Sequence, residues 1–480
     1  MRLLRELACG WLYTRGLSIV CPEDTVKRSR KIQLLVLLVV MVIAALSWLT
    51  LRPRGPMDFA SGTRVDLTAY RGSDPTGAPP GVAEADLVAR GEYLARAADC
   101  IGCHTAQGGK PFAGGLAFKL PFGTLYSTNI TPDKETGIGD WTDHEFVKAM
   151  HEGVGRNGKR LYPAFPYTSY SLLTRNDVLA VKTYLFSLKP VHKTPAENDM
   201  WFPFNQRYLM WFWNVLFNPG QRFQPNMDQT PVWNRGAYLV EALGHCGECH
   251  TPRTLLQGLD AGKKFGGAMI EGWKAYNITA DTESGIGMWS DDELADYLAS
   301  GHAEGRSTAA GPMGLALNNS LRFLTRDDIR AMVAYLRTVT PIHDQADLAV
   351  AQKPPSITSS STARTETPHG PASNDEELGL RVFEGACAGC HHWDGSGVQS
   401  PYAALIGNRT VNDPAAVNLM QVILHGASLQ SPQGEVFMPA FGKGYSDAEI
   451  AAVANYVTGR FGARASAITP DQVANRRDDN

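Results

Sequence analysis

Three short cysteine motifs constrain this chain more strongly than any other feature of its sequence. Six of its eight cysteines form three pairs, each with two residues between the cysteines and a histidine directly after the second. The copies read Cys100-Ile101-Gly102-Cys103-His104, Cys246-Gly247-Glu248-Cys249-His250 and Cys387-Ala388-Gly389-Cys390-His391. Cys-x-x-Cys-His is the attachment signature of haem c, in which both thiols form thioethers to the porphyrin and the histidine is held against the iron.

Two other uses of such a cysteine pair fit the pattern less well. A zinc ribbon combines two Cys-x-x-Cys knuckles, and a thioredoxin-like redox pair does not call for the following histidine. Here every copy carries the histidine and takes the same place in an internal repeat. We therefore predict three covalent haems c. Their attachment residues are Cys100, Cys103, Cys246, Cys249, Cys387 and Cys390, and their proximal iron ligands are His104, His250 and His391.

The repeat extends on both sides of each motif. An Arg-Gly-x-Tyr-Leu stretch precedes the first two motifs, and a glycine takes its place in the third; the stretches begin at Arg90 and Arg235, and the third glycine is Gly379. Each unit ends in an amphipathic helical pattern led by an acidic residue; these acids are Asp177, Asp328 and Glu449. We predict that the glycine lets the two terminal helices of each unit approach closely. The two arginines could contact haem propionates or serve packing.

These units predict a mainly α fold with three tandem cytochrome c domains after one N-terminal transmembrane helix. A chain of 480 residues has room for three domains. The expected domain boundaries are 85–192, 231–345 and 374–463. The remaining segments are an aromatic-rich linker at 193–230, a flexible linker at 346–373 and a polar tail at 464–480. The aromatic rings of the first linker could pack against the modules or form a patch at the membrane surface near a quinone.

The N-terminus predicts the topology. Residues 32–51 are uncharged and strongly apolar, and at about 1.5 Å per residue such a helix crosses a hydrocarbon core of about 30 Å. Four Lys and Arg residues stand in 27–31, so the positive-inside bias places residues 1–31 in the cytoplasm and the haem domains in the periplasm. We expect a single-pass anchor in the inner (cytoplasmic) membrane, with a cleaved signal peptide as the alternative.

The distal iron ligand of an electron-transfer cytochrome c is usually a methionine from the loop before the closing helix. Met313 stands in Gly-Pro-Met-Gly and Met438 in Phe-Met-Pro, each in that position. We predict that they bind the irons of haems 2 and 3. Met332 and Met420 lie on expected helices and are interpreted as core residues.

The first unit lacks such a methionine. Phe165 takes the corresponding place, and a phenyl ring cannot bind iron. The sixth position of haem 1 is then open, or filled by His144, His151 or Met150. Without a role in iron binding, Met150 would be a residue of the helix core. The two histidines are seven residues apart, and without such a role they would lie on a solvated helix face.

The chain resembles the triple-haem cytochrome c subunits of membrane-bound bacterial alcohol, aldehyde, and gluconate or sugar dehydrogenases. The resemblance covers roughly residues 85–460 and rests on the haem motifs and several further stretches. These are Asn129-Ile130-Thr131 and Asn277-Ile278-Thr279, each leading to Gly-Ile-Gly-x-Trp, the Tyr-Pro-Ala-x-Pro-Tyr loop at 162–167, Gly-Pro-Met-Gly at 311–314, and Pro203-Phe204-Asn205-Gln206-Arg207. A net charge of −3 gives no reason to expect nucleic acid as a partner.

The resemblance implies a non-catalytic subunit that relays electrons from a periplasmic dehydrogenase subunit through three haems to ubiquinone. Phe165 stands where alcohol dehydrogenase subunits carry Met, which favours an aldehyde-oxidising partner with molybdopterin and iron–sulfur subunits over a quinoprotein or flavoprotein. Two alternatives remain open. One is a peroxidase-type haem enzyme that uses an open haem 1, and the other is a cytochrome that feeds a terminal oxidase.

Overall fold

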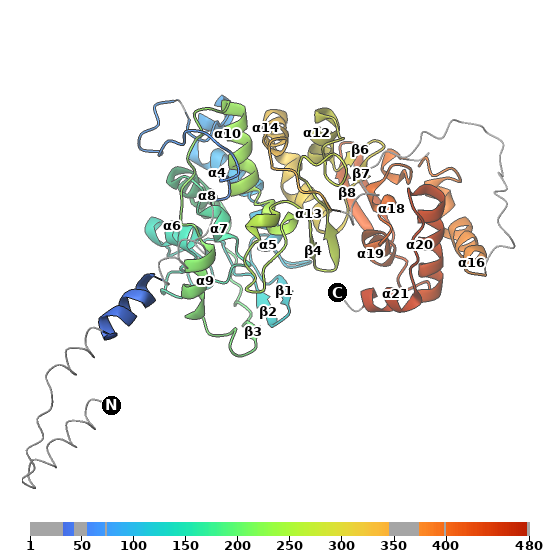
Figure 1. Ribbon diagram of the computed structural model, residues 1–480, viewed down its shortest axis with the longest axis horizontal. Coiled ribbons are helices and arrows are strands. Elements are labelled where there is room, and N and C mark those ends of the chain that lie inside the picture. The colour runs from blue at the N-terminus through green and yellow to red at the C-terminus, as the bar shows by residue number, and fades with distance from the viewer. Residues whose placement is uncertain (1–31, 43–54, 73, 345–373, 398–399, 478–480) are drawn as a thin grey trace, which may run out of the picture. The chain divides into compact units, whose positions relative to one another are not determined.

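The computed structural model describes residues 32–42, 55–72, 74–344, 374–397 and 400–477 (Figure 1). The chain divides into two compact units, Met1–Pro53 and Arg54–Asn480. Residues 32–42 of the first unit form a helix. No helix within the described ranges is both long enough and apolar enough to cross a bilayer. The expected cytoplasmic segment, residues 43–51 of the expected anchor and the linker 346–373 lie outside the described residues.

The second unit is mainly helical, as predicted, and its three repeats are called modules 1, 2 and 3. Module 1 contains α3 (Pro80–Ala83), α4 (Leu87–Ala97), α5 (Cys100–Cys103), α6 (Asp143–Glu152), α7 (Tyr167–Tyr170) and α8 (Arg175–Ser187). Module 2 contains α10 (Pro231–Ala237), η1 (Tyr238–Leu243), α11 (Gly247–His250), η2 (Ala261–Lys263), α12 (Asp291–Ser300), α13 (Gly311–Asn319), η3 (Leu321–Phe323) and α14 (Arg326–Leu336). Module 3 contains α16 (Asn374–Val382), η5 (Phe383–Cys387), α17 (Ala388–His391), η6 (Pro401–Ala403), α18 (Arg409–Asn412), α19 (Val417–His425) and α20 (Asp447–Phe461).

Short antiparallel sheets, which the sequence did not predict, connect these helices. β1 (Ala117–Leu120), β2 (Gly123–Tyr126) and β3 (Asp199–Met200) form a three-stranded sheet in that order, with Phe118 opposite Leu125. The other strands pair in twos: β4 (Ala268–Ile270) with β5 (Trp273–Ala275), β6 (His302–Ala303) with β7 (Ser307–Thr308), and β8 (Ala427–Ser431) with β9 (Gly434–Met438).

A glycine crossing holds the first and last helices of each module together. A Cβ atom on Gly91 of α4 would lie 1.9 Å from the carbonyl oxygen of Ala180 in α8. The same atom on Gly236 would lie 1.9 Å from the oxygen of Ala331, and on Gly379 it would lie 2.4 Å from that of Ala452. These distances leave no room for a methyl group, so the predicted role of the three glycines is confirmed.

The closing helices begin where the acidic residues predict. Thr174, Thr325 and Ser446 are the N-caps of α8, α14 and α20, and each hydroxyl accepts the backbone N–H of the acid three residues later. In module 3 Glu449 returns a bond to the N-cap backbone and completes a capping box. In modules 1 and 2 the corresponding acids Asp177 and Asp328 are buried instead, 1% exposed each.

Modules 1 and 2 share one continuous hydrophobic core, whereas module 3 has a core of its own. The linker 193–230 contributes Phe223 to the shared core, where the fully buried ring lies 5.1 Å from that of Tyr238. Other rings of the linker, on and before α9 (Leu209–Phe217), face outward, and Trp201 and Phe202 are 65% and 78% exposed. The packing interpretation is therefore confirmed for Phe223, and the exposed rings leave a membrane-surface patch as a prediction.

The segment 464–480, expected to be a polar tail, contains a docked helix. In α21 (Pro470–Arg477) the side chain of Val473 is fully buried in the module 3 core. Arg477 forms an ion pair with Asp447 at the start of α20. The helix therefore packs against module 3.

We predict that Gly91→Ala lowers the free energy of unfolding by about 1–3 kcal/mol, because the new methyl group forces α4 and α8 apart. Denaturant unfolding of the haem-loaded protein measures this change. Gly81→Ala in α3 is the control, since a Cβ atom at that position would meet no atom of the described residues within 4 Å. Equal stability of the two variants would contradict the crossing argument.

Candidate functional site

Each cysteine motif lies on a short helical turn directly after the first helix of its module. The turns are α5, α11 and α17. In modules 2 and 3 the preceding helix widens into the π-helical turns η1 and η5, whereas in module 1 the chain turns at Asp99, which has a φ of 47°. Local π turns often occur at functional sites because they redirect side chains without ending the helix.

The three motif histidines share one hydrogen-bond arrangement. Their Nδ1 atoms lie 2.7 Å from Thr128 O, 2.7 Å from Tyr276 O and 2.6 Å from Ala403 O, for His104, His250 and His391 respectively. A carbonyl oxygen can only accept, so each Nδ1 carries the proton and each Nε2 keeps a lone pair. A histidine that binds iron through Nε2 requires this tautomer and this kind of second hydrogen bond.

Burial keeps these groups neutral. It lowers the pKa of all three imidazoles, that of His250 to about 4. Burial also raises the pKa of the Cys100 and Cys246 thiols to about 12. Reactive redox cysteines have the opposite shift. An imidazole beside two thiols is the donor set that haem c requires, so the residues of each motif fit the group.

Both predicted methionine ligands are half-buried at the edge of a core, although not in loops. Met313 lies in the first turn of α13, whose Gly311 packs on the ring of Trp273 in β5. β5 leads directly to Tyr276, the partner of His250. Met438 is the last residue of β9 and pairs with Ala427. The secondary structure around both methionines therefore differs from the loop that the flanking Pro and Gly residues predicted.

In module 1 an aromatic cluster stands where the other modules have methionine. Phe165 precedes α7, and its ring lies 5.4 Å from that of Tyr170 and 6.4 Å from that of Tyr167. The Tyr170 hydroxyl donates to the carbonyl oxygen of Ala98 at 3.0 Å, so this ring lies beside the chain two residues before Cys100. Phe165 therefore belongs to a packed apolar wall next to that motif.

The other candidates for the sixth ligand of haem 1 differ in burial. Met150 is buried in the core, as expected, and His144 is exposed, as a solvated helix face predicts. The same expectation is wrong for His151, which is only 3% exposed. The seven-residue spacing placed the two histidines on one helix face but could not reveal that the segment 211–222 covers the end of that face.

The first two cysteine motifs lie close together. The charge of Cys249 contributes to raising the pKa of Cys103, after burial and Asp99. The ring of Tyr170 in module 1 lies 5.7 Å from that of His245, which directly precedes the second motif. The helix that carries Met313 also contacts α5. Two haems attached here would be neighbours across one shared core.

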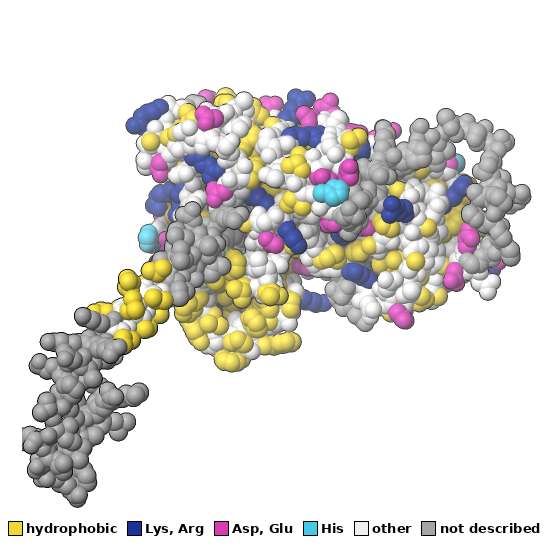
Figure 2. Space-filling view, in the orientation of Figure 1, with side chains coloured by type: hydrophobic (Ala, Val, Ile, Leu, Met, Phe, Trp, Pro, Cys, Tyr) yellow, Lys and Arg dark blue, Asp and Glu magenta, His cyan; other side chains and the backbone are white. Residues whose placement is uncertain are grey.

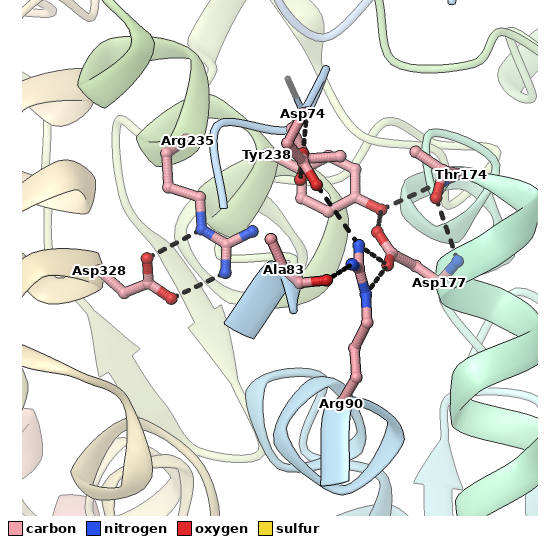
Figure 3. Close-up of polar contacts among 9 residues, drawn as sticks. Asp74, Ala83, Arg90, Thr174, Asp177, Arg235, Tyr238 and Asp328 are labelled. Atoms are coloured by element: carbon pink, nitrogen blue, oxygen red, sulfur yellow. Dashed lines mark hydrogen bonds and ion pairs between the residues drawn. The ribbon is translucent and has the colours of Figure 1, made fainter. Parts of the chain in front are cut away.

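Two buried ion pairs fasten the helix crossings of modules 1 and 2 (Figure 3). Arg90 donates to Asp177 Oδ1 at 2.9 and 2.6 Å, and Arg235 donates to both Asp328 oxygens at 2.8 and 2.7 Å. Burial lowers the pKa of Arg235, but its hydrogen bond and charge interaction with Asp328 outweigh that effect. Both arginines therefore hold packed helices together, which is the packing role considered from the sequence beside contact with haem propionates.

The tyrosines of the same repeat cross between modules. Tyr93 of module 1 donates to Asp328 of module 2 at 2.5 Å, and Tyr238 of module 2 donates to Asp177 of module 1 at 2.6 Å. Burial raises the pKa of both tyrosines, so they remain protonated donors. We call these four residues with Arg90 and Arg235 the Tyr–Asp clasp. Each carboxylate accepts an arginine from its own module and a hydroxyl from the neighbouring one.

Module 3 is attached differently. Arg409, 4% exposed, donates to the carbonyl oxygens of Asn277 and Ser284 and lies 4.6 Å from the ring centre of Tyr276. Lys274 forms an ion pair with Asp413 at 3.3 Å. These contacts place a module 3 cation beside the loop that orients His250. The sequence repeat held no signal for them, because module 3 lacks the Arg-Gly-x-Tyr stretch.

Comparison with known proteins identifies similar chains. A family model described as cytochrome c matches residues 88–189 and 376–460. A nicotinate dehydrogenase subunit of Pseudomonas putida is 42% identical over 392 residues, 80% of this chain; the chain spans only 31% of that protein. The gluconate 2-dehydrogenase cytochrome c subunit of Pantoea cypripedii is 38% identical, covering 82% of this chain and 90% of that subunit. The fructose dehydrogenase cytochrome subunit of Gluconobacter japonicus is 38% identical, covering 84% and 85%.

We predict that Tyr93→Phe and Tyr238→Phe each lower the free energy of unfolding by about 1.5–3 kcal/mol, since each removes a hydrogen bond to a buried carboxylate. Asp328→Asn should cost more, about 3–5 kcal/mol, because it leaves the buried Arg235 cation uncompensated. Calorimetric unfolding tests both. Tyr208→Phe is the control, because this tyrosine is 64% exposed, and a clasp variant as stable as this control would contradict the assignment.

Proposed function

Because the chain belongs to the family of cytochrome c subunits of dehydrogenase complexes, we propose that it is a three-haem electron relay. It receives electrons from a catalytic dehydrogenase subunit and is not itself catalytic. The observation that carries the proposal is that all three motif histidines have the same geometry. In each, Nδ1 is hydrogen-bonded to a backbone carbonyl, so Nε2 keeps its lone pair, and two thiols lie alongside in the motif. A haem bound at each motif supplies reversible one-electron chemistry.

The chain's own residues tune these sites. Met313 and Met438 act as distal ligands, and a thioether ligand raises the reduction potential. Phe165 offers no ligand, so the first site is five-coordinate or bound by another group. The three sites are therefore expected to differ in potential, with haems 2 and 3 as the higher pair if a nitrogen ligand completes haem 1.

Ubiquinone is the proposed electron acceptor, and the inner membrane is the proposed location. The apolar segment 32–51 with its preceding basic residues supports a single-pass anchor with the modules in the periplasm. The exposed linker rings, Trp201 and Phe202 among them, support contact with the membrane surface.

The proposed partner is an aldehyde-oxidising subunit with molybdopterin, accompanied by an iron–sulfur subunit. The support is the Pro163-Ala164-Phe165-Pro166-Tyr167 form of the module 1 loop. The similar proteins serve gluconate, fructose and nicotinate dehydrogenases by name. Copurification of the native complex, followed by analysis of its cofactors, tests the choice, and a pyrroloquinoline quinone or flavin partner would overturn it.

We predict that wild-type protein carries three haems per chain and that the double change Cys387→Ala and Cys390→Ala reduces this number to two. Module 3 has its own hydrophobic core, so the other two sites should remain loaded. Pyridine haemochrome absorbance per mole of peptide measures the count. Cys9→Ser, outside the three motifs, should leave it at three.

We predict that carbon monoxide binds one ferrous haem of the wild-type protein, because Phe165 cannot occupy the sixth position in module 1. Phe165→Met introduces a thioether where the other modules have one, and it should abolish carbon monoxide binding and raise the potential of that haem. Difference spectra and redox titration give both results. Phe323→Met on η3 is the matched control. Wild-type spectra that carbon monoxide leaves unchanged would contradict an open site.

A further inference from the structure

A pocket in module 1 lies outside the three haem motifs. It has a volume of about 320 Å³ and is lined by the end of α6, by Arg160 in the loop after α6, by α9 and by the segment that follows α9. Volumes from about 300 Å³ upward accommodate small organic ligands. The residues that matter for its chemistry are His151, Arg160, Trp211, Asn214 and Arg222.

His151 is the unusual member of this lining. It is 3% exposed, and its Nε2 has no hydrogen-bond partner among the described residues. Burial, assisted by the charge of Arg222, lowers its pKa to about 4, while a hydrogen bond to the Leu173 backbone opposes that shift. The ring is therefore neutral near pH 7. With its other nitrogen donating to Leu173, Nε2 is left as an acceptor, and a buried acceptor without a donor costs about 1–3 kcal/mol.

We infer that this pocket binds the head group of a quinone, with His151 Nε2 accepting a hydrogen bond from a ring hydroxyl of the reduced form. The guanidinium groups of Arg160 and Arg222 supply donors for a carbonyl or hydroxyl oxygen on the ring, and Trp211 supplies a flat apolar face. A planar ring with oxygen atoms on opposite sides can donate to His151 Nε2 at one side and accept from a guanidinium group at the other.

The surroundings of the pocket favour a ligand with an apolar tail. Trp211 is 51% exposed, and Tyr208 and Phe212 beside it are 64% and 57% exposed. Figure 2 shows hydrophobic side chains gathered over the sheet β1–β3 and the neighbouring end of α9. A quinone tail extending from the pocket would lie along this apolar surface, where a free polar metabolite would gain nothing.

A chain of aromatic contacts joins the pocket to the first haem motif. Tyr167 donates to Asn214 Oδ1 at 2.6 Å, and its ring contacts that of Phe165. The Phe165 ring in turn contacts that of Tyr170, whose hydroxyl donates to the carbonyl oxygen of Ala98, two residues before Cys100. Three packed rings therefore connect the pocket with the haem 1 site.

This inference rests on the proposed function, which supplies the electrons. Reduction of one quinone to its hydroquinone consumes two electrons, delivered one at a time by the cytochrome, and two protons taken from solvent. Each hydroxyl group so formed is a donor of the kind that His151 Nε2 lacks among the described residues.

The test uses the purified complex of the cytochrome with its dehydrogenase subunit. A short-chain azidoquinone is bound and photolysed, and the labelled peptides are mapped; substrate-driven reduction of a short-chain ubiquinone and of ferricyanide is measured in parallel. His151→Gln should raise the inhibition constant of added short-chain ubiquinol about tenfold, the scale of one lost hydrogen bond to the reduced form, and leave ferricyanide reduction unchanged. Val215→Trp, which fills the pocket and leaves His151 in place, should abolish labelling of α6 and α9.

His144→Gln is the matched control, because this exposed histidine lies on the same helix outside the pocket. It should behave as wild type in every assay. Labelling elsewhere in the complex, or wild-type quinone kinetics in both pocket variants, would overturn the assignment of this pocket and leave the proposed relay intact. A wild-type complex that reduces ferricyanide but no quinone would overturn quinone as the acceptor, and the pocket assignment with it.

Discussion

The two carboxylates of the Tyr–Asp clasp are the constraint on which the arrangement of modules 1 and 2 depends. A buried carboxylate is tolerated only when its charge and its lone pairs are satisfied. Asp177 and Asp328 obtain the charge from an arginine of their own module and a further hydrogen bond from a tyrosine of the other. Neither module can therefore satisfy its own closing helix alone, and the same two modules also share one hydrophobic core.

Much of the fold could be predicted from local spacing. The glycine in the first helix and the acids at the start of the closing helices stand at the same place in each unit, so the repeat reveals them. The tautomer of the motif histidines could not be predicted, because their carbonyl partners come from loops 12 to 26 residues away. The repeat also showed that Tyr93 and Tyr238 are equivalent, but equivalence does not say which module each one contacts.

The wrong predictions about Met313 and His151 have physical reasons. Pro and Gly beside Met313 suggested a loop, yet proline is also favoured in the first turn of a helix, and α13 begins there. His151 lies on the amphipathic helix where a solvated residue is expected, but a segment more than 50 residues later in the chain covers it. Burial that arises from distant segments leaves no periodic pattern in the sequence.

The clasp also sets an order of assembly. Tyr93 and Asp328 are separated by 235 residues, so a chain that is made from its N-terminus completes module 1 long before this bond can form. Asp177 has its arginine early but lacks the hydroxyl of Tyr238 until the chain has grown 61 residues further. Closing a loop of this length adds little entropy cost beyond that of a shorter one, so the delay is one of synthesis rather than of thermodynamics. A truncated chain that ends before Tyr238 would carry a finished first motif on a module whose closing helix is still incompletely paired.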